Sequence, residues 1–366
     1  NYIPNWLKLA GEGRIIEAAE LCHETNSLPE VCGRICPQDR LCEQACTLTT
    51  GFGAVTIGAM EKYIVDEAFR LGWRPDLSRV KTKPWSVGVV GAGPAGLACA
   101  DVLSRNGISV TVYDRYPEIG GLLSFGIPDF KLELKVMRRR REVLEGAGIH
   151  FRLNCEIGRD IQASELESMH DALFFGTGTY TPVDAGLPGA DQGGIVPALD
   201  YLIGQTGHLY DLELSDFPHI SLAGEQVLVL GGGDTAMDCV RTAIRQGAES
   251  VHCVYRRDRE NMPGSQREVE HAMKEGVKFE FNTLPLDLVH EGRKLTGLNV
   301  ARTRLVQPEG GGRARPVQIE GSEEILPAST LIFAFGYRPS PPGWLQVLNV
   351  ETQKNGLVRT GDSLPG

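Results

Sequence analysis

The stretch that decides the fold runs from Ser86 to Gly96 and reads SVGVVGAGPAG. Its first five residues have the apolar, β-branched character of a short buried strand, and a helical pattern follows the last glycine. The spacing G-x-G-x-x-G between them is typical of a phosphate-binding turn in that context. Gly91 would make the tight turn, Gly93 would let a pyrophosphate approach the backbone, and Gly96 would allow close packing of strand and helix. The stretch therefore predicts a dinucleotide-binding α/β unit.

A carboxylate follows at the distance that such a unit requires. A second strand, Ser109 to Tyr113, ends in Asp114, about 20 residues beyond the glycine turn. The carboxylate can accept hydrogen bonds from a ribose 2′-hydroxyl, and the N-terminus of the helix would face the phosphates. A second glycine-rich loop, Gly120 to Pro128, would lie along the same nucleotide. The alternative is a glycine-rich turn that binds no ligand.

The same unit recurs in the second half of the chain. A strand-like run at 227–230 leads into Gly231 to Ala236, which has the related spacing G-x-G-x-x-A, and a helical run follows. The next strand ends in Arg256 and Arg257, where the first copy has Asp114. A carboxylate would repel a ribose 2′-phosphate, whereas guanidinium groups bind one through charge-assisted hydrogen bonds. We therefore expect FAD or NAD at the first site and NADP at the second, unless the arginines only cap a surface strand.

Two further apolar strands end in glycine, one after each phosphate turn. They lie at 171–178 and 330–336. In flavoproteins with two dinucleotide sites, strands of this kind carry the chain between the FAD and NADP domains. Gly178 and Gly336 would let the backbone approach the cofactors.

Four of the nine cysteines lie close together, with the spacing C-x3-C-x5-C-x3-C: Cys32, Cys36, Cys42 and Cys46. Disulfides are unusual in a large chain without a secretion signal. Structural zinc sites usually have two ligand pairs separated by a longer loop. Closely spaced thiolates and a Cys-Pro step are typical of iron-sulfur clusters. A cluster is the favoured interpretation, with zinc and inert thiols as the alternatives.

The composition limits other functions. A net charge of −10 over 366 residues argues against general nucleic-acid binding. No stretch approaches the ~18 apolar residues of a membrane-spanning helix, and without a visible targeting segment we expect a cytoplasmic protein. The basic run Arg138 to Arg141 precedes Glu142 and Glu145, which favours a solvated helix face with i to i+4 ion pairs over a docking surface.

Four segments resemble the small (beta) subunit of bacterial NADPH-dependent glutamate synthase: Glu30 to Cys42, Gly120 to Pro128, Gly231 to Arg241 and Tyr255 to Ser265. The same module is similar to the N-terminal half of dihydropyrimidine dehydrogenase. The resemblance implies FAD at the first site, NADPH at the second and 4Fe-4S clusters in a helical domain. It also implies hydride transfer from NADPH to the flavin, then single-electron steps to a large (alpha) subunit that makes glutamate from glutamine and 2-oxoglutarate.

Hydride transfer depends on the orientation of two rings more than on a protein acid or base, so no catalytic residue is expected. One alternative is the same module serving another acceptor, such as ferredoxin or a pyrimidine-reducing partner. Another is a scaffold subunit that binds nucleotides without turnover.

The predicted fold class is α/β, with two Rossmann-like dinucleotide-binding domains, for FAD and NADP, preceded by a small helical iron-sulfur domain. The expected boundaries are 1–84 for the iron-sulfur domain, 85–195 for the first part of the FAD domain, 196–336 for the NADP domain and 337–366 for an incomplete return to the FAD domain. The expected metal ligands are Cys32, Cys36, Cys42 and Cys46. The cofactor-binding residues expected from the motifs and the resemblance are Gly91, Ala92, Gly93, Pro94, Ala95, Gly96, Asp114, Gly121, Leu122, Lys131, Ile157, Gly178, Gly231, Gly233, Asp234, Thr235, Ala236, Arg256, Arg257 and Gly336.

The chain departs from the family pattern at three points. The family has another cysteine group upstream of the position of Asn1, so we expect this chain to supply at most one complete cluster. Glu61 falls where a relative uses a non-cysteine ligand, and the alternative is an exposed helical carboxylate. The chain stops at Leu364-Pro365-Gly366, before the Gly-Asp segment that closes over the flavin in this family. We therefore expect a fragment of a longer protein.

Overall fold

The computed structural model describes residues 1–184, 186–190, 193–308 and 310–361. The chain divides into two compact units, one formed by residues 1–180 with the C-terminal segment from Pro339, and one formed by Thr181–Arg338. The second unit is therefore inserted into the first. The predicted return of 337–366 to the FAD domain can be followed as far as Gly361, and its last residues lie outside the described part of the chain.

The first unit begins with a bundle of short helices. Apolar residues at helical spacing on the longest of them, among them Ile57, Ile64 and Ala68, face the bundle core. Two glycines bring the third and fifth helices close together, because a Cβ on Gly33 would lie only 2.7 Å from the carbonyl oxygen of Gly58. The elements are α1 (Ile3–Gly11), α2 (Ile15–Thr25), α3 (Pro29–Ile35), η1 (Gln38–Arg40), α4 (Thr49–Phe52) and α5 (Ile57–Arg70).

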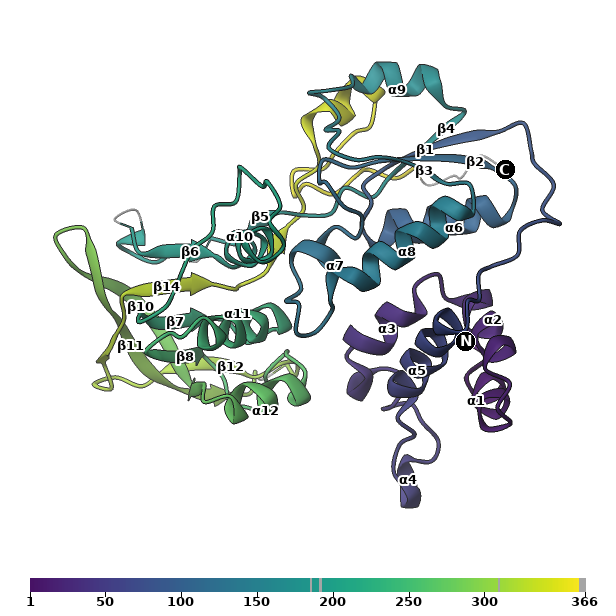
Figure 1. Ribbon diagram of the computed structural model, residues 1–366. Helices are drawn as coiled ribbons and strands as arrows, with labels where there is room; N and C mark the ends of the chain where they lie inside the picture. The colour runs from purple at the N-terminus through teal and green to yellow at the C-terminus, as the bar shows by residue number, and fades with distance from the viewer. Residues whose placement is uncertain (185, 191–192, 309, 362–366) are drawn as a thin grey trace. The chain divides into compact units, whose positions relative to one another are not determined.

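The rest of the first unit is built on a parallel sheet of order β3-β2-β1-β4. Val87 to Val90 pair with one neighbouring strand on each side, which buries the centre of the sheet. In Figure 1, α6 and α8 lie on one face of this sheet and α9 on the other. The elements are β1 (Ser86–Val90), α6 (Pro94–Arg105), β2 (Ser109–Tyr113), α7 (Leu122–Phe125), α8 (Leu134–Gly146), β3 (His150–Arg152), α9 (Ala163–Met169), β4 (Ala172–Phe175) and, in the C-terminal segment, η3 (Gly343–Leu348).

The second unit has its own parallel sheet, of order β6-β14-β7-β8-β9, and a smaller antiparallel sheet formed by β10 to β13. The short strands β5 and β15 pair where the chain enters and leaves the unit. The elements are β5 (Thr181–Pro182), β6 (Ile195–Pro197), α10 (Ala198–Tyr210), β7 (Gln226–Leu230), α11 (Asp234–Arg245), β8 (Ser250–Tyr255), α12 (Gln266–Lys274), β9 (Lys278–Phe281), β10 (Thr283–Glu291), β11 (Lys294–Val306), β12 (Arg315–Gln318), β13 (Glu324–Pro327), β14 (Thr330–Phe333) and β15 (Tyr337–Arg338).

The two parallel sheets repeat one plan. In each, a strand leads through a glycine turn into a helix and then into a neighbouring parallel strand: β1, α6 and β2 in the first unit, and β7, α11 and β8 in the second. The apolar strand expected at 171–178 is β4, which pairs with β1, and the one expected at 330–336 is β14, which pairs with β7. The predicted α/β fold with two Rossmann-like units behind a helical segment is confirmed.

One expectation about α8 is wrong in part. Arg141 does pair with Glu145 one turn along the helix, at 2.8 Å, as the charge pattern indicated. Arg139 and Arg140, however, bind residues of the helical bundle, and the side chain of Arg140 is only 1% exposed. A charge pattern within one helix reports neighbours on that helix and carries no information about the other elements that pack against it.

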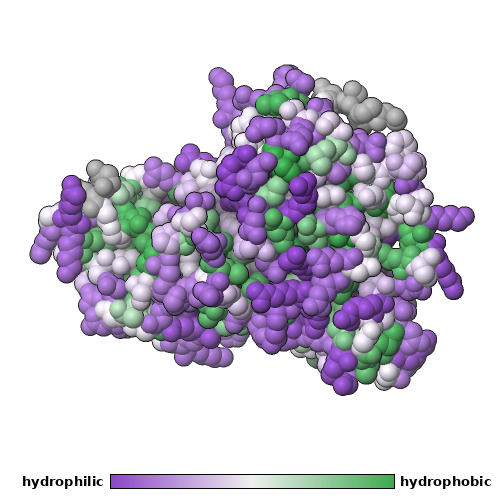
Figure 2. All heavy atoms as spheres, turned by 45° about the horizontal axis from the view of Figure 1, so that its top comes forward, coloured by the Kyte–Doolittle hydropathy of each residue, from purple (hydrophilic) through white to green (hydrophobic). Residues whose placement is uncertain are grey.

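No helix in the described ranges combines the length and the apolar character that crossing a membrane requires. On the face drawn in Figure 2, hydrophilic residues predominate and hydrophobic residues form small separate patches.

Candidate functional site

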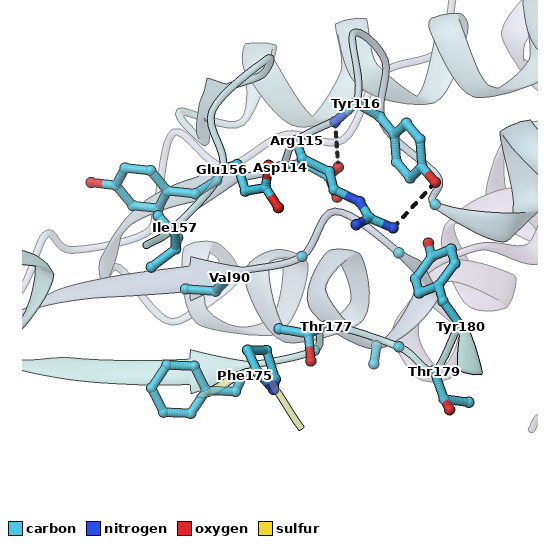
Figure 3. A pocket seen from close by; sticks show the side chains of 18 of the residues that line it. Val90, Asp114, Arg115, Tyr116, Glu156, Ile157, Phe175, Thr177, Thr179 and Tyr180 are labelled. Carbon is cyan, nitrogen blue, oxygen red and sulfur yellow. Dashed lines mark hydrogen bonds between the residues drawn. The ribbon is translucent and has the colours of Figure 1, made fainter. Parts of the chain in front are cut away.

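A cavity of about 690 Å³ opens at the carboxyl ends of β1, β2 and β4. Its volume lies within the range of cofactor sites, and parallel α/β sheets bind their ligands at this edge. Figure 3 shows that side chains from the segments after all three strands converge on it. The C-terminal segment also contributes, through Ser340, Pro342 and Trp344.

The glycines of the first turn have separate geometric tasks. Gly91 has a φ of +107°, and a Cβ there would lie 2.3 Å from the carbonyl oxygen of Gly176. A Cβ on Gly96 would lie 1.8 Å from the carbonyl oxygen of Gly91, so only glycine lets helix α6 start this close to the strand. A Cβ on Gly93 would meet no atom within 4 Å, and Gly93 lines the cavity. The open space beside Gly93 is a cradle that a Cβ would fill, and it fits a phosphate group.

Asp114 braces the glycine turn from the end of β2. Its Oδ2 accepts a hydrogen bond from the backbone N–H of Ala92 at 2.6 Å, and its Oδ1 accepts one from the N–H of Tyr116 at 2.9 Å. Burial raises the pKa of the carboxyl group, and these two donors partly offset that effect. Asp114 also lines the cavity, and a carboxylate has lone pairs left after these two bonds. It is therefore available for the expected ribose contact.

An arginine between two tyrosines lies beside Asp114, and the sequence motifs did not indicate it. The guanidinium of Arg115 lies 5.1 Å from the ring centre of Tyr116 and 4.5 Å from that of Tyr180. The ring of Tyr116 stacks in turn on Phe125 at 4.5 Å. Figure 3 shows the side chains of Arg115, Tyr116 and Tyr180 together at one end of the cavity. Held in this way, Arg115 offers a fixed positive charge to an anionic ligand.

Most of the residues expected at the first site do line the cavity. They are Gly91, Gly93, Pro94, Ala95, Asp114, Gly121, Leu122, Ile157 and Gly178. Three of the expected residues do not line the cavity in the part of the chain that the structure describes: Ala92, Gly96 and Lys131. Ala92 and Gly96 lie in the turn itself and are buried, and Lys131 precedes α8. The sequence motifs missed Trp344, which packs 5.5 Å from Phe175 and closes against Gly158, because its position depends on the chain returning after the inserted unit.

The second glycine turn repeats this geometry. Gly231 has a φ of +149°, and a Cβ there would lie 2.4 Å from the carbonyl oxygen of Ala334, whereas a Cβ on Gly233 would meet nothing within 4 Å. Thr235 and Ala236 lie in the first turn of α11, and Asp234 at its start accepts a hydrogen bond from the N–H of Ser265 at 2.8 Å. The loop after β8 is thereby fastened over the turn.

The two arginines after β8 differ in their surroundings. Arg256 is exposed, and its carbonyl oxygen accepts a hydrogen bond from Thr303. The Nε of Arg257 is buried and has no hydrogen-bond partner among the described residues. A buried guanidinium N–H without a partner is costly unless an anion completes it, which fits the expected 2′-phosphate. Gly336 follows β14 with a φ of +95°, and its carbonyl accepts the N–H of Val183.

The four clustered cysteines are free and half-buried. Cys32 lies on α3 and Cys36 follows its last residue, and the hydrogen bond between the two thiols lowers the pKa of Cys32 and raises that of Cys36. In the described parts of the chain, no three His, Cys, Asp or Glu side chains are already gathered around one metal position. A set of four thiols suits a soft metal centre by its chemistry.

Two polar residues lie beside Cys32. Glu61 is buried rather than exposed, and burial together with the charge of Cys32 raises the pKa of its carboxyl group to about 7. Its Oε1 accepts a hydrogen bond from Nδ2 of Asn26 at 3.1 Å, and Oδ1 of Asn26 lies 3.6 Å from the sulfur of Cys32. The interpretation of Glu61 as an exposed helical carboxylate is therefore wrong.

Comparison with known proteins agrees with this geometry. Residues 1–73 match the family model "Dihydropyrimidine dehydrogenase domain II, 4Fe-4S cluster", and residues 85–364 match "Pyridine nucleotide-disulphide oxidoreductase". The chain is 57% identical over 98% of its length to the glutamate synthase [NADPH] small chain of Escherichia coli and 56% identical over 98% to that of Halomonas elongata, and it covers 76% of each. The chain belongs to the glutamate synthase small-chain family. The resemblance drawn from the sequence is confirmed, and the protein is an oxidoreductase of this type.

Two other similarities place this family membership in context. The chain is 54% identical over 98% of its length to AegA of Escherichia coli, which is named only as an oxidoreductase and of which it covers 55%. Among solved structures it is similar to FprA of Mycobacterium tuberculosis in complex with NADPH, with a TM-score of 0.58, 21% identity, and coverage of 71% of this chain and 73% of that one. This second similarity reflects the shared fold of the small-chain family and FprA.

Proposed function

We propose that this chain takes electrons from NADPH and passes them through FAD and a 4Fe-4S cluster to a large (alpha) subunit that makes glutamate. The observation that carries the proposal is the contrast between two matched turns. The strand after the first turn ends in Asp114, and the strand after the second ends in Arg257, whose Nε is buried without a partner among the described residues. One unit thus suits a ribose with a free hydroxyl and the other a ribose 2′-phosphate.

The residues of the first site would hold and orient FAD. The open backbone at Gly93 would take the pyrophosphate, Asp114 the ribose, and Arg115 an anionic part of the cofactor. When bound, the flavin accepts a hydride, which carries two electrons, and releases them one at a time. The chain would need to align the two nucleotides and exclude water, and we expect no side chain to act as acid or base.

The residues of the second site would hold NADPH, with Gly233 against the pyrophosphate and Arg256 and Arg257 on the 2′-phosphate. We propose that residues 85–180 and the segment from Pro339 serve FAD and that residues 181–338 serve NADPH, so that the expected boundaries at 195 and 336 move to those of the two compact units. Residues 1–84 would hold the cluster, through Cys32, Cys36, Cys42 and Cys46. We place the protein in the cytoplasm.

The acceptor proposed here follows from relatives that are named as glutamate synthase small chains. A second candidate is the same electron-input module serving a different acceptor. The 54% identity to AegA over nearly the whole of this chain supports this second candidate. The sequence of this chain is nearly as similar to AegA, a longer protein with a different name, as to the glutamate synthase small chains.

Anaerobic titration of the purified holoprotein with NADPH tests the proposal. We expect the first NADPH per flavin to bleach the visible absorbance of the flavin, and further NADPH to supply the additional electron that gives the electron paramagnetic resonance (EPR) signal of a reduced cluster. Adding glutamate synthase large subunit, glutamine and 2-oxoglutarate should restore the flavin absorbance and form glutamate. Bleaching without glutamate formation would favour the second candidate, and a protein that does not bleach is no NADPH oxidoreductase.

A further inference from the structure

Helix α8 connects the cavity of the first unit with the helical bundle that carries the cysteines. On one side, Nη1 of Arg141 lies 3.4 Å from Oε1 of Glu118, in the loop just before Gly121 and Leu122, which line the cavity. The helix itself presents Arg139 and Arg140 to the bundle. Helix α8 thus contacts both the loop next to the cavity wall and the bundle helices around Cys32.

The central contact is a buried ion pair between α8 and α3. Nε of Arg140 donates to Oε1 of Glu30 at 2.6 Å, and Nη2 donates to Oε2 of the same carboxylate, so the pair is bidentate. The side chains are 1% and 0% exposed. Burial opposes ionisation of Glu30, but the guanidinium outweighs it and lowers the pKa of the carboxyl group. Glu30 precedes Cys32 on α3 by less than one helical turn.

A histidine from α2 completes this contact. Nδ1 of His23 donates to the carbonyl oxygen of Ala19 at 2.7 Å, which leaves Nε2 to accept a hydrogen bond from Nη2 of Arg140 at 3.0 Å. Only the neutral imidazole can make both bonds. Arg105 of α6 also donates to the carbonyl oxygen of His23. Two groups of the bundle, the carboxylate of Glu30 and the imidazole of His23, therefore fix the guanidinium of Arg140, and Arg105 in turn holds the backbone of His23.

Arg139 adds a parallel contact to α5. Its Nη2 donates to Oδ1 of Asp66 at 2.7 Å, and its guanidinium lies 4.5 Å from the ring centre of Phe69. The other carboxylate oxygen of Asp66 binds Arg34 of α3 at 2.7 Å. The second contact thus ends on the same helix as the first.

A buried ion pair adds little net stability compared with apolar packing, because both charges lose their hydration. What a bidentate pair does supply is one fixed geometry, since guanidinium and carboxylate must be coplanar and in register. The pair therefore suits a task of alignment better than one of stabilisation.

We propose that Arg140 is a positioning residue: its paired contact with Glu30 and His23 sets the distance between the flavin cavity and the cysteine-bearing helix α3. The proposal rests on the proposed function, since it concerns the electron step from flavin to cluster. Electron transfer between two fixed centres slows steeply as the gap between them widens. The residue acts through α3 and touches neither cofactor.

The test compares three variants of the holoprotein. Arg140→Met removes the charge and keeps the length of the side chain, and Arg140→Lys keeps the charge but loses the bidentate geometry. Arg138→Met is the matched control, because Arg138 lies on the same helix with its side chain 51% exposed, 3.6 Å from Glu118. The first readout is hydrogen exchange of the α3 backbone amides in Pro29–Ile35. The second is rapid mixing with NADPH, which separates bleaching of the flavin from the later reduction of the cluster.

We expect Arg140→Met to speed exchange in α3 on the order of a hundredfold, because an unpaired Glu30 would remain buried. Cluster reduction should slow roughly tenfold, while the rate of flavin bleaching and the behaviour of Arg138→Met stay at the level of the unaltered protein. Arg140→Lys should recover part of both losses. If Arg140→Met does not fold, Arg140→Lys alone decides by the same two readouts.

A purely structural role would lower the melting temperature and leave the cluster step of the folded protein unchanged, and that result would overturn the proposal. Unchanged exchange in α3 would overturn it as well. If the unaltered protein showed no flavin bleaching, the proposed function would fail, whereas the exchange measurement would still report whether Arg140 fixes α3. The two failures are therefore distinguishable.

Discussion

The glycines of the two phosphate turns show how one residue type serves two purposes. At Gly91, Gly96 and Gly231 a side chain would collide with a backbone carbonyl, so glycine is a condition of the fold. At Gly93 and Gly233 a side chain would meet nothing within 4 Å, so the protein alone does not require glycine. The space at these two positions has a use only when a ligand fills it.

The contrast predicts opposite results for two alanine variants. Gly96→Ala should destabilise the protein without cofactor by roughly 2–3 kcal/mol, because the new methyl group forces strand and helix apart. Gly93→Ala should leave that stability within about 0.5 kcal/mol and weaken FAD binding at least tenfold. Urea unfolding of the cofactor-free protein and FAD titration by fluorescence measure the two effects. Equal destabilisation by both variants would contradict the assignment of Gly93 to the ligand.

The arginines after β8 predict the choice of nicotinamide cofactor. Arg257→Leu should raise the KM for NADPH by roughly 10- to 100-fold, the range for one charge-assisted pair, and leave the KM for NADH nearly unchanged. The control is Arg259→Leu, because Arg259 is half exposed and pairs with Glu270 at 3.4 Å. Equal losses with both cofactors would show that Arg257 caps a surface strand instead.

The residues of the glycine turns and Asp114 could be predicted because each follows a strand at a fixed spacing. Arg115, Tyr116 and Tyr180 could not, since they meet only when the turn after β2 and the segment after β4 come together at the sheet edge. No local spacing records that meeting. The assignment of each site residue to a cofactor stays a prediction.

At the scale of elements, α8 shows the limit of reading charge patterns. The pairing of Arg141 with Glu145 follows from helical spacing. The burial of Arg140 depends on two other helices, α2 and α3, which lie more than 100 residues earlier in the chain. The antiparallel pair of β10 and β11 was also missed, although Gly292 between two alternating runs, with a φ of +64°, is the usual signal of a hairpin.

The contact between α2 and α8 predicts a pH dependence of stability. Burial and the nearby charge of Arg140 lower the pKa of His23 from 6.5 to about 4. Between pH 6.5 and 4, His23 is therefore protonated in the unfolded chain but neutral in the folded one. Its contribution to stability is fully present above pH 6.5 and is lost as the pH falls towards 4. The loss attributable to His23 should reach about 3 kcal/mol.

Urea unfolding between pH 7 and pH 4 measures this dependence. The pKa values of Glu30 and Asp66 are lowered, so these groups also reduce the stability of the protein as the pH falls. The part of the stability loss that is due to His23 is therefore obtained by comparison with His23→Gln. That variant should show a shallower fall between pH 6.5 and 4, whereas a change at the exposed His150 to Gln should not. Parallel curves for His23→Gln and the unaltered protein would contradict the neutral, buried histidine.

At the scale of the whole molecule, one nucleotide unit is inserted into another. The order of the segments was predictable, because the two glycine turns and the cysteine group occur in a fixed sequence along the chain. No comparable sequence motif marks the two points at which the chain passes between the units, which lie at Tyr180 to Thr181 and at Arg338 to Pro339. They are defined by the pairing of β5 with β15, which joins residues far apart in the chain.

The insertion predicts that residues 181–338 fold alone. Their sheet and core residues lie within that range, and their ends are paired. We expect a single cooperative thermal transition, and a higher melting temperature with 2′,5′-ADP than with 5′-AMP at equal concentration. The same fragment with Arg257→Leu is the control and should lose the difference. An aggregated or unfolded fragment would contradict the division into two units.

The same topology fixes an order of events during synthesis on the ribosome. Trp344, which closes the first cavity against Phe175, leaves the ribosome only after the whole inserted unit has emerged. Domains fold as units while the chain grows. During translation, the inserted unit can therefore fold completely before Trp344 has been synthesised. The cavity of the first unit is completed last, after the inserted unit has folded.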